Sequence, residues 1–281
     1  MTLEMRNARP DTAQLIESLI TIVSEANAAI MKIRGGDIGV RTKDDNSPVT
    51  LADEASDAII QAGLARLLPD VPVVSEESAT TAARPGAGAE FLLVDPLDGT
   101  KEFISGNDEF TVNIALLQDG KPMLGVVGAP AQGVIWWGIV GQAAERLELT
   151  PGAPASEVRN RRAIRARQWP GDTVVAMVSR SHLDPKSEEL LSRLPKVDRA
   201  GCGSSVKFCR LAEGTADIYP RLAPTSEWDI AAGHAVLAAA GGSVTAPDGQ
   251  PLTYGVNPKG FLVPQFLAVG DRAGLRQLGI A

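Results

Sequence analysis

Apolar residues in the first half of the chain follow two different spacings. Between Asp11 and Gly35 they recur at intervals of three and four residues, which predicts an amphipathic helix, and a second helix is expected from Thr50 to about Leu68. Short apolar runs bounded by turn residues then replace this spacing and predict strands. The runs cover residues 71–78, 91–98, 111–118, 123–130, 134–140 and 144–149. Because the last four follow one another across short turns, we expect an antiparallel meander.

A segment of small residues and prolines at 150–156 separates this half from the next. Beyond it, strands are expected at 173–179, 215–221 and 261–270, and helices at 185–194, 203–214 and 229–242. Alternation of strands with helices is typical of α/β structure. We therefore predict an N-terminal α+β domain over residues 1–149, which carries most of the metal ligands described below, and a C-terminal α/β domain over residues 150–281.

Composition and charge narrow the possible functions. The chain has 281 residues, of which 44% are hydrophobic, so an ordinary globular core is expected. Its net charge of −7 argues against a nucleic-acid polymer as a partner, because binding of phosphate backbones depends on basic surfaces. Two cysteines, Cys202 and Cys209, suggest neither a zinc site nor a disulfide framework. Near the start there is no apolar signal segment, and no run approaches the roughly 18 apolar residues of a membrane span. We expect a cytoplasmic protein without a transmembrane segment.

Acidic residues stand where predicted strands end and where predicted helices begin. They are Glu76 and Glu77, Asp95 and Asp98, and the helix-initial Asp53 and Asp229. Carboxylates at strand ends are often solvated, and DPLDG alone is a common kind of turn. Clustered carboxylates, however, cost several kcal/mol each to bury unless they are compensated. Oxygen ligands suit Mg²⁺, and a pair of metal ions is a known device for phosphoryl transfer. The cluster therefore predicts a metal site, with Gly99 allowing close backbone approach to an anion.

Three motifs, taken together, resemble the inositol monophosphatase superfamily of Mg²⁺-dependent, lithium-sensitive phosphatases. They are DPLDGT at 95–100, Trp228-Asp229, and SEES at 75–78. Three further segments resemble its 3′(2′),5′-bisphosphate nucleotidase branch: TKEF at 100–103, GSSVKFC at 203–209 and YPR at 219–221. The resemblance implies an α+β / α/β fold, a layered αβαβα sandwich of the inositol monophosphatase and sugar phosphatase type.

The resemblance also implies roles for individual residues. The metal ligands would be Glu76, Asp95, the Leu97 carbonyl, Asp98 and Asp229, holding two to three Mg²⁺ ions with Asp95 as a bridge. Thr100, oriented by Asp53, would position and help deprotonate a metal-activated water that attacks in line. Substrate contacts are implied at Glu76, Leu97, Asp98, Gly99, Thr100, His182, Ser204, Lys207, Arg221 and Asp229. Among these, Arg221 would lie near the second phosphate.

The implied activity belongs to a phosphoric monoester hydrolase. It would convert a small nucleotide, adenosine 3′,5′-bisphosphate, to AMP and phosphate, and so clear a by-product of sulfate assimilation. Such an enzyme would work in the cytoplasm or peripherally on the cytoplasmic side of the inner membrane, as a monomer or a homodimer. An inositol or sugar phosphatase with the same metal core is the alternative. A non-catalytic binding module is disfavoured because Asp53 and Thr100 are both present along with every acidic ligand.

Overall fold

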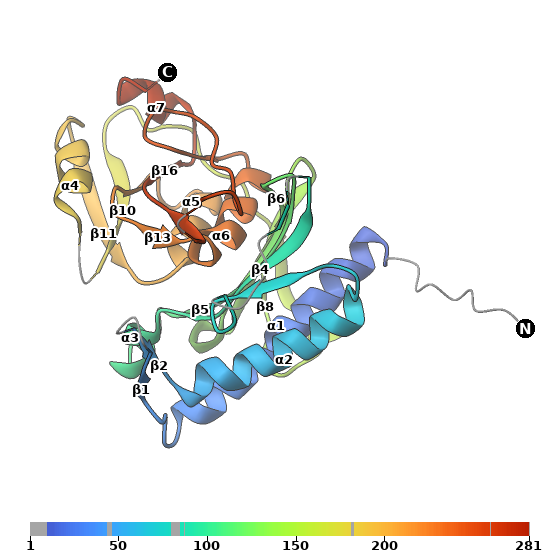
Figure 1. Cartoon of the computed structure of the whole chain (residues 1–281). Helices are drawn as coiled ribbons and strands as arrows, with labels where there is room; N and C mark the ends of the chain where they lie inside the picture. The colour runs from blue at the N-terminus through green and yellow to red at the C-terminus, as the bar shows by residue number, and fades with distance from the viewer. Residues whose placement is uncertain are drawn as a thin grey trace, which may run out of the picture.

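Two large sheets and the helices around them are stacked as alternating layers (Figure 1). The structure, a computed structural model, describes residues 10–43, 47–79, 85–86, 88–180, 183–258 and 260–280. Three hydrophobic cores lie between the successive layers. This arrangement confirms the αβαβα sandwich. No helix of these residues is both long enough and apolar enough to cross a membrane.

Helices α1 (Thr12–Arg34) and α2 (Leu51–Leu67) form the first layer and pack side by side (Figure 1). Both predicted helices are confirmed. The Asp11 carboxylate accepts a hydrogen bond from the backbone of Gln14 at the start of α1. At the start of α2, Thr50 forms a reciprocal capping box with Asp53. Apolar side chains of both helices share one core with alternate residues of strand β4 (Glu90–Asp98).

The second layer is a seven-stranded sheet in the order β3-β4-β5-β6-β7-β8-β9. The remaining strands are β3 (Val73–Ser75), β5 (Thr111–Gln118), β6 (Lys121–Ala129), β7 (Val134–Ile139), β8 (Ala143–Glu148) and β9 (Arg159–Ala163). Strand β3 pairs parallel with β4, and every later pair is antiparallel, so the meander is confirmed. Strand β9 follows the segment 150–156 in the sequence and still extends this sheet. The division into two domains stays a prediction.

The next layers alternate in the same way. Helices α5 (Val206–Ala212) and α6 (Trp228–Ala239) share a core with both sheets. The second sheet has the order β11-β10-β12-β16-β14. Its strands are β10 (Val174–Ser179), β11 (Val197–Cys202), β12 (Ile218–Arg221), β14 (Ser243–Thr245) and β16 (Phe266–Val269). Helices α4 (Pro185–Ser192) and α7 (Ala273–Gln277) pack on its outer face. The predicted α/β pattern of this half is confirmed.

Glycines in the large sheet allow α6 to pack unusually close to it. A Cβ atom on Gly125 of β6 would lie 2.3 Å from the carbonyl oxygen of Ala232. A Cβ atom on Gly138 of β7 would lie 2.8 Å from the Cα atom of Val236. Both distances are shorter than carbon and oxygen atoms tolerate, so these positions require glycine. The close packing fixes the position of α6 and of the acidic residue near its start.

The short elements differ most from the prediction. The strand expected over 261–270 is instead two strands, β15 (Leu262–Val263) and β16, which pair with different partners. Pro264 lies between them and has no N–H group to continue a ladder. Strand β15 pairs with β13 (Thr225–Ser226). Further short elements are β1 (Arg41–Thr42), β2 (Pro48–Val49), helix α3 (Thr100–Ile104) and two 3₁₀ helices, Pro130–Gln132 and Ala155–Glu157.

Candidate active site

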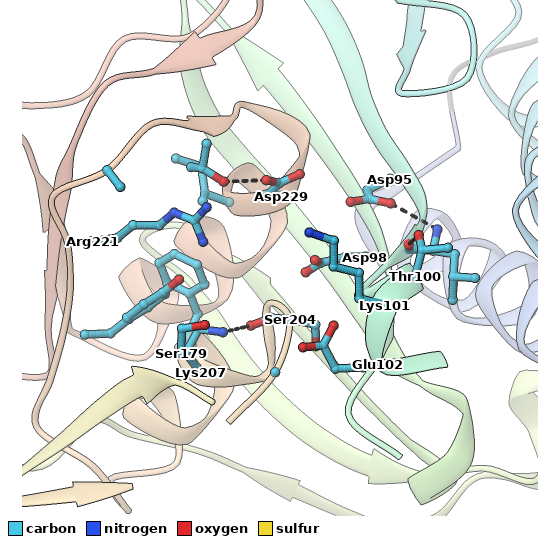
Figure 2. Close-up of a pocket in the computed structure, with 18 of the residues that line it drawn as sticks. Asp95, Asp98, Thr100, Lys101, Glu102, Ser179, Ser204, Lys207, Arg221 and Asp229 are labelled. Atoms are coloured by element: carbon cyan, nitrogen blue, oxygen red, sulfur yellow. Dashed lines mark hydrogen bonds between the residues drawn. The ribbon is translucent and has the colours of Figure 1, made fainter. Parts of the chain in front are cut away.

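A cavity of about 480 Å³ opens between the carboxyl end of β4 and the C-terminal half of the chain. All predicted site residues except Asp53 and His182 line it. Asp53 lies behind Thr100, as described below, and His182 lies outside the described residues. Figure 2 shows Asp95, Asp98 and Thr100 on one side of the cavity and Arg221 and Lys207 across from them. The structure therefore brings residues from both halves of the chain to one place.

Asp95 and Asp98 are placed by an irregularity at the end of β4. The pairing of β4 with β5 shifts register between these two residues. In a regular strand, side chains three positions apart point to opposite faces of the sheet. The bulge redirects them, so both carboxylates line the cavity. The Leu97 amide donates to Asp95 Oδ1 at 3.0 Å, and the Ser56 hydroxyl donates to the Pro96 carbonyl at 2.8 Å. These two bonds hold the bulge in place.

Asp98 is also held from the other half of the chain. The Ser205 amide donates to Asp98 Oδ2 at 2.6 Å, and Thr111 Oγ1, 3.4 Å from the same oxygen, can donate its proton either to Asp98 or to Ser205 Oγ. The Ser205 hydroxyl in turn bonds Thr111 Oγ1 at 2.8 Å and Asn113 Oδ1 at 2.7 Å. The start of α5 is thereby fastened to β5. All of these bonds to Asp98 use one oxygen, which leaves Oδ1 available for a ligand.

Asp229 lies in the first turn of α6, which begins at Trp228, one residue earlier than expected. The Thr225 hydroxyl and the Ser226 amide both donate to Asp229 Oδ2, the latter at 3.2 Å. A side-chain hydrogen bond also joins Asp229 to Asp95, so these two carboxyl groups lie next to each other in the cavity. The N-terminal end of α6 also contributes a favourable positive dipole for an anion in the cavity.

Burial raises the pKa values of all four acids, and the charges of neighbouring acids add to the rise for Glu76, Asp95 and Asp98. Burial raises the pKa of Glu76 to about 7, and the charges of Asp229 and Glu77 add to this rise. Burial and the charge of Asp229 raise the pKa of Asp98 to about 7. Burial, Glu76 and Asp98 raise the pKa of Asp95 well above its ordinary value, and burial also raises that of Asp229. Nearby cations therefore compensate the cluster only in part.

One compensating cation was not anticipated from the sequence. Lys43 follows β1 and donates to Glu76 Oε1 at 2.8 Å and to Glu77 Oε1 at 2.7 Å. It stands in the polar segment KDDNSP, where the sequence gives no sign that a hairpin carries it to the acids. Lys101 and Glu102 also line the cavity and had not been assigned a role.

The donors of the cavity suit a hard divalent cation. Glu76, Asp95, Asp98 and Asp229 offer carboxylate oxygens, and Leu97 offers a carbonyl in the same lining. The protein hydrogen bonds described above for Asp98 use only one of its oxygens, and all four acids have raised pKa values. Within the described part of the chain, no three acidic, histidine or cysteine side chains already converge on a single point as a metal cluster. The donor set fits Mg²⁺, and the assignment of individual ligands stays a prediction.

Thr100 and Asp53 form a hydrogen-bonded pair at the edge of the cavity. Thr100 Oγ1 donates either to Asp53 Oδ1 or to the Leu97 carbonyl, each at 3.2 Å. Asp53 Oδ2 accepts from the Thr50 amide at 2.8 Å and from the Thr50 hydroxyl at 2.6 Å. The cap of α2 therefore also fixes Asp53. Burial raises the pKa of Asp53, which makes its carboxylate a better proton acceptor.

Two buried polar atoms of the cavity lining, one in Ser204 and one in Arg221, have no hydrogen-bond partner among the described residues. Ser204 has a φ of +46°, and its buried Oγ has no hydrogen-bond partner among the described residues. The same holds for the buried Nε of Arg221, whose Nη2 donates to the Pro224 carbonyl at 3.3 Å. Lys207 is buried and donates to the Ser204 carbonyl at 2.7 Å, so it is not a solvated helix charge. Its ammonium also lies 5.1 Å from the ring centroid of Tyr219.

Other residues singled out in the sequence have structural positions. Both cysteines are free and buried. His234 is buried and its Nδ1 hydrogen-bonds the Tyr254 hydroxyl at 2.8 Å, away from the cavity lining. Trp136 and Trp137 are adjacent residues of β7 whose side chains enter the two cores on opposite faces of the sheet.

Five alternating layers with an acidic cavity at the end of β4 define a phosphatase fold of known type. The chain belongs to the Inositol monophosphatase family, whose profile matches residues 11–269. It is 44% identical over 254 residues to the 3′(2′),5′-bisphosphate nucleotidase CysQ of Escherichia coli (strain K12), with 90% of this chain and 98% of that protein covered. The CysQ of Buchnera aphidicola is 36% identical and covers 88% of this chain and 89% of its own.

Solved structures agree with this assignment. CysQ from Bacteroides thetaiotaomicron, a bacterial member of the inositol monophosphatase family, superimposes with a TM-score of 0.73 at 32% identity, over 92% of this chain and 97% of its own. The Thermotoga maritima IMPase has a TM-score of 0.72 at 21% identity, over 94% of this chain and 95% of its own, and shows likeness of fold alone.

Proposed function

We propose that the protein is a Mg²⁺-dependent 3′(2′),5′-bisphosphate nucleotidase that converts adenosine 3′,5′-bisphosphate to AMP and phosphate. The printed name of the CysQ relatives supports this substrate class. The observation that carries the proposal is the polarity of the cavity. Acids that suit metal ions line the cavity, and the Ser204 hydroxyl and the Arg221 Nε, which have no partner among the described residues, line the same cavity. A substrate with two separate phosphates matches a cavity built in this way.

In this proposal, Glu76, Asp95, Asp98, Asp229 and the Leu97 carbonyl hold two to three Mg²⁺ ions. Bound Mg²⁺ would supply positive charge against the phosphoryl group and lower the pKa of water toward neutrality.

The chain's own residues orient the nucleophile. Thr100 Oγ1 accepts a proton from the attacking water while it donates its own to Asp53 Oδ1, which lies 3.2 Å away. Asp53 is prepared for this role because its second oxygen is already occupied by Thr50 and because burial raises its pKa. Gly99, with a φ of +93°, turns the backbone at the start of α3, where amides would bond the phosphate that water attacks while the nucleoside hydroxyl leaves.

The remaining phosphate and the nucleoside bind the part of the cavity lined by Arg221, Ser204 and Lys207. Arg221 supplies a guanidinium that can bond two phosphate oxygens at once, and the Ser204 hydroxyl supplies a further hydrogen bond. Lys207 donates two of its three ammonium protons to the carbonyls of Cys202 and Ser204. It therefore acts mainly as a fixed positive charge beneath this part of the substrate.

A panel of substrates tests the proposal. With Mg²⁺ present, kcat/KM should be at least about 10-fold higher for adenosine 3′,5′-bisphosphate than for inositol 1-phosphate or a sugar phosphate, because a site built to bond the second phosphate rejects substrates that lack it. The variant Asp95→Asn is the inactive control. Higher kcat/KM for inositol phosphate would favour the inositol phosphatase alternative. Absence of turnover on every substrate would favour a binding module. Lithium sensitivity, a role in sulfate assimilation, cytoplasmic location and dimer formation stay predictions.

A further inference from the structure

Glu109 packs against two turns of the cavity lining, at Gly99 and at Gly203. It stands just before β5, outside the cavity lining and outside the sequence motifs that resemble the family. A Cβ atom on Gly99 would lie 3.2 Å from the Glu109 carbonyl oxygen, and one on Gly203 would lie 2.6 Å from it. The same backbone group therefore packs against the turn at Gly99 and the turn at Gly203. Both glycines are needed for this close contact.

The side chain of Glu109 connects the turn at Gly203 to the end of β10 in the five-stranded sheet. Glu109 Oε2 accepts from the Gly203 amide at 2.8 Å. Arg180, just after β10, donates to both carboxylate oxygens of Glu109, at 2.7 and 3.1 Å. Arg180 also donates to the Gly201 carbonyl at 3.0 Å. We call this set of bonds the Glu109–Arg180 clasp. Burial alone would raise the pKa of Glu109, but the bonds from Arg180 and Gly203 outweigh it and lower the pKa, so the carboxylate stays charged.

The clasp holds one end of a turn whose other end is fastened independently. Ser205 is tied to β5 and to Asp98 by its amide and hydroxyl. Between the two anchors stands Ser204, at a φ of +46° that a residue other than glycine rarely adopts. A conformation of this kind persists only where its surroundings over-determine it. Lys207 also holds the carbonyls of Cys202 and Ser204, so the clasp's own contribution is to fix the Gly203 amide. Removing the clasp should therefore shift Gly203 and the side chain of Ser204 but leave Ser205 and Asp98 in place.

We propose that the Glu109–Arg180 clasp is a positioning device for substrate recognition: it holds Ser204 where its hydroxyl meets the part of the substrate beyond the cleaved phosphate. Glu109 and Arg180 are positioning residues and do not touch the reacting atoms. This inference rests on the proposed function for the identity of the substrate. We expect the clasp to affect binding of the part of the substrate beyond the cleaved phosphate and not the chemical step.

Kinetics on a large and a small substrate test the clasp. Glu109→Ala should raise KM for adenosine 3′,5′-bisphosphate about 10-fold, through loss of a charge-assisted bond and displacement of Ser204, with kcat changed less than about 3-fold. KM for p-nitrophenyl phosphate, which has no second phosphate, should stay near the wild-type value. Glu109→Gln keeps an acceptor for the Gly203 amide, so its effect should be smaller. Arg180→Gln should resemble Glu109→Gln, and Arg180→Lys should recover part of the loss.

A matched pair elsewhere provides the control. Arg199 also forms a bidentate ion pair, with Glu188 of α4, and neither residue lines the cavity. Glu188→Gln should leave both KM values unchanged. Equal rises in KM on both substrates, a fall in kcat alone, or no change in Glu109→Ala would overturn the inference. If the wild type does not hydrolyse the bisphosphonucleotide, the proposed function fails by itself. The clasp is then tested with the largest phosphomonoester that the wild type hydrolyses, by the same comparison.

Discussion

Without divalent metal ions, the stability of the protein should fall as the pH rises through neutrality. Glu76 and Asp98 have pKa values of about 7 in the folded protein, against ordinary values of 4.5 and 3.8. Near pH 7 the folded state therefore binds protons that the unfolded state has already released. Under this condition the free energy of unfolding decreases with pH. Below pH 6.5 the effect is opposed by buried His234, whose pKa is lowered from 6.5 to about 4 and which must stay neutral in the fold.

The window from pH 6.5 to 8 reports mainly on the acidic cluster, because the opposing contribution of His234 is small above pH 6.5. A group with a folded pKa of about 7 loses roughly 0.8 kcal/mol of stabilisation across this window, so Glu76 and Asp98 together account for about 1.5 kcal/mol. Asp95, whose pKa is raised well above its ordinary value, adds up to about 1.4 kcal/mol per pH unit wherever it still holds a proton. We expect a total loss of about 2 kcal/mol or more.

Urea unfolding at constant ionic strength measures this loss. The protein is compared at pH 6.5 and pH 8, once with EDTA and once with Mg²⁺. Saturating Mg²⁺ should remove most of the pH dependence, because an ion present at 100 times its dissociation constant stabilises the folded state by about 2.7 kcal/mol. Asp98→Asn removes one titrating group, and its amide oxygen can still accept from Ser205. It should show about half the pH dependence in EDTA and be more stable than wild type at pH 8. An EDTA-treated wild type that is as stable at pH 8 as at pH 6.5 would refute the reasoning.

Three further predictions concern the catalytic pair, the second phosphate and the packing of α6. Thr100→Ala should lower kcat by about 100-fold at saturating Mg²⁺, and the double variant with Asp53→Asn should lose less than the product of the single losses; full multiplicativity in steady-state kinetics would mean that the two act separately. Arg221→Ala should raise KM for the bisphosphonucleotide by about 10-fold or more and spare p-nitrophenyl phosphate, and equal losses on both would assign it a structural role. Gly125→Ala should lower the free energy of unfolding, measured in urea, by about 1–3 kcal/mol, because the new methyl group meets the backbone of α6. The control Gly171→Ala should be neutral, because a Cβ atom there meets nothing within 4 Å. Equal effects of the two variants would contradict the packing argument.

The layers and the main residues of the cavity could be predicted, because hydrophobic spacing and short motifs depend only on residues that are close together in the sequence. Hydrophobic spacing places α1 and the meander, and the motif DPLDGT places two acids at one strand end. What could not be predicted depends on contacts between distant segments. Lys43 reaches Glu76 only because a hairpin folds back on the cavity, and Glu109 reaches Gly203 across 94 positions of sequence. The division of 261–270 into two strands also depends on the pairing partners that each half finds.

The dependence of the cavity on α6 has a consequence for the order of folding. Asp95 and Asp98 are synthesised well over a hundred residues before Asp229, which reaches them only when α6 docks against the glycines of β6 and β7. A ribosome-bound chain with the complete meander therefore lacks an acid of the cluster, and contacts of this sequence separation form late because long loops must first close. High Mg²⁺ affinity would then be gained in the final docking step. A metal-sensitive fluorescent probe could follow that step during refolding, separately from the formation of the sheet.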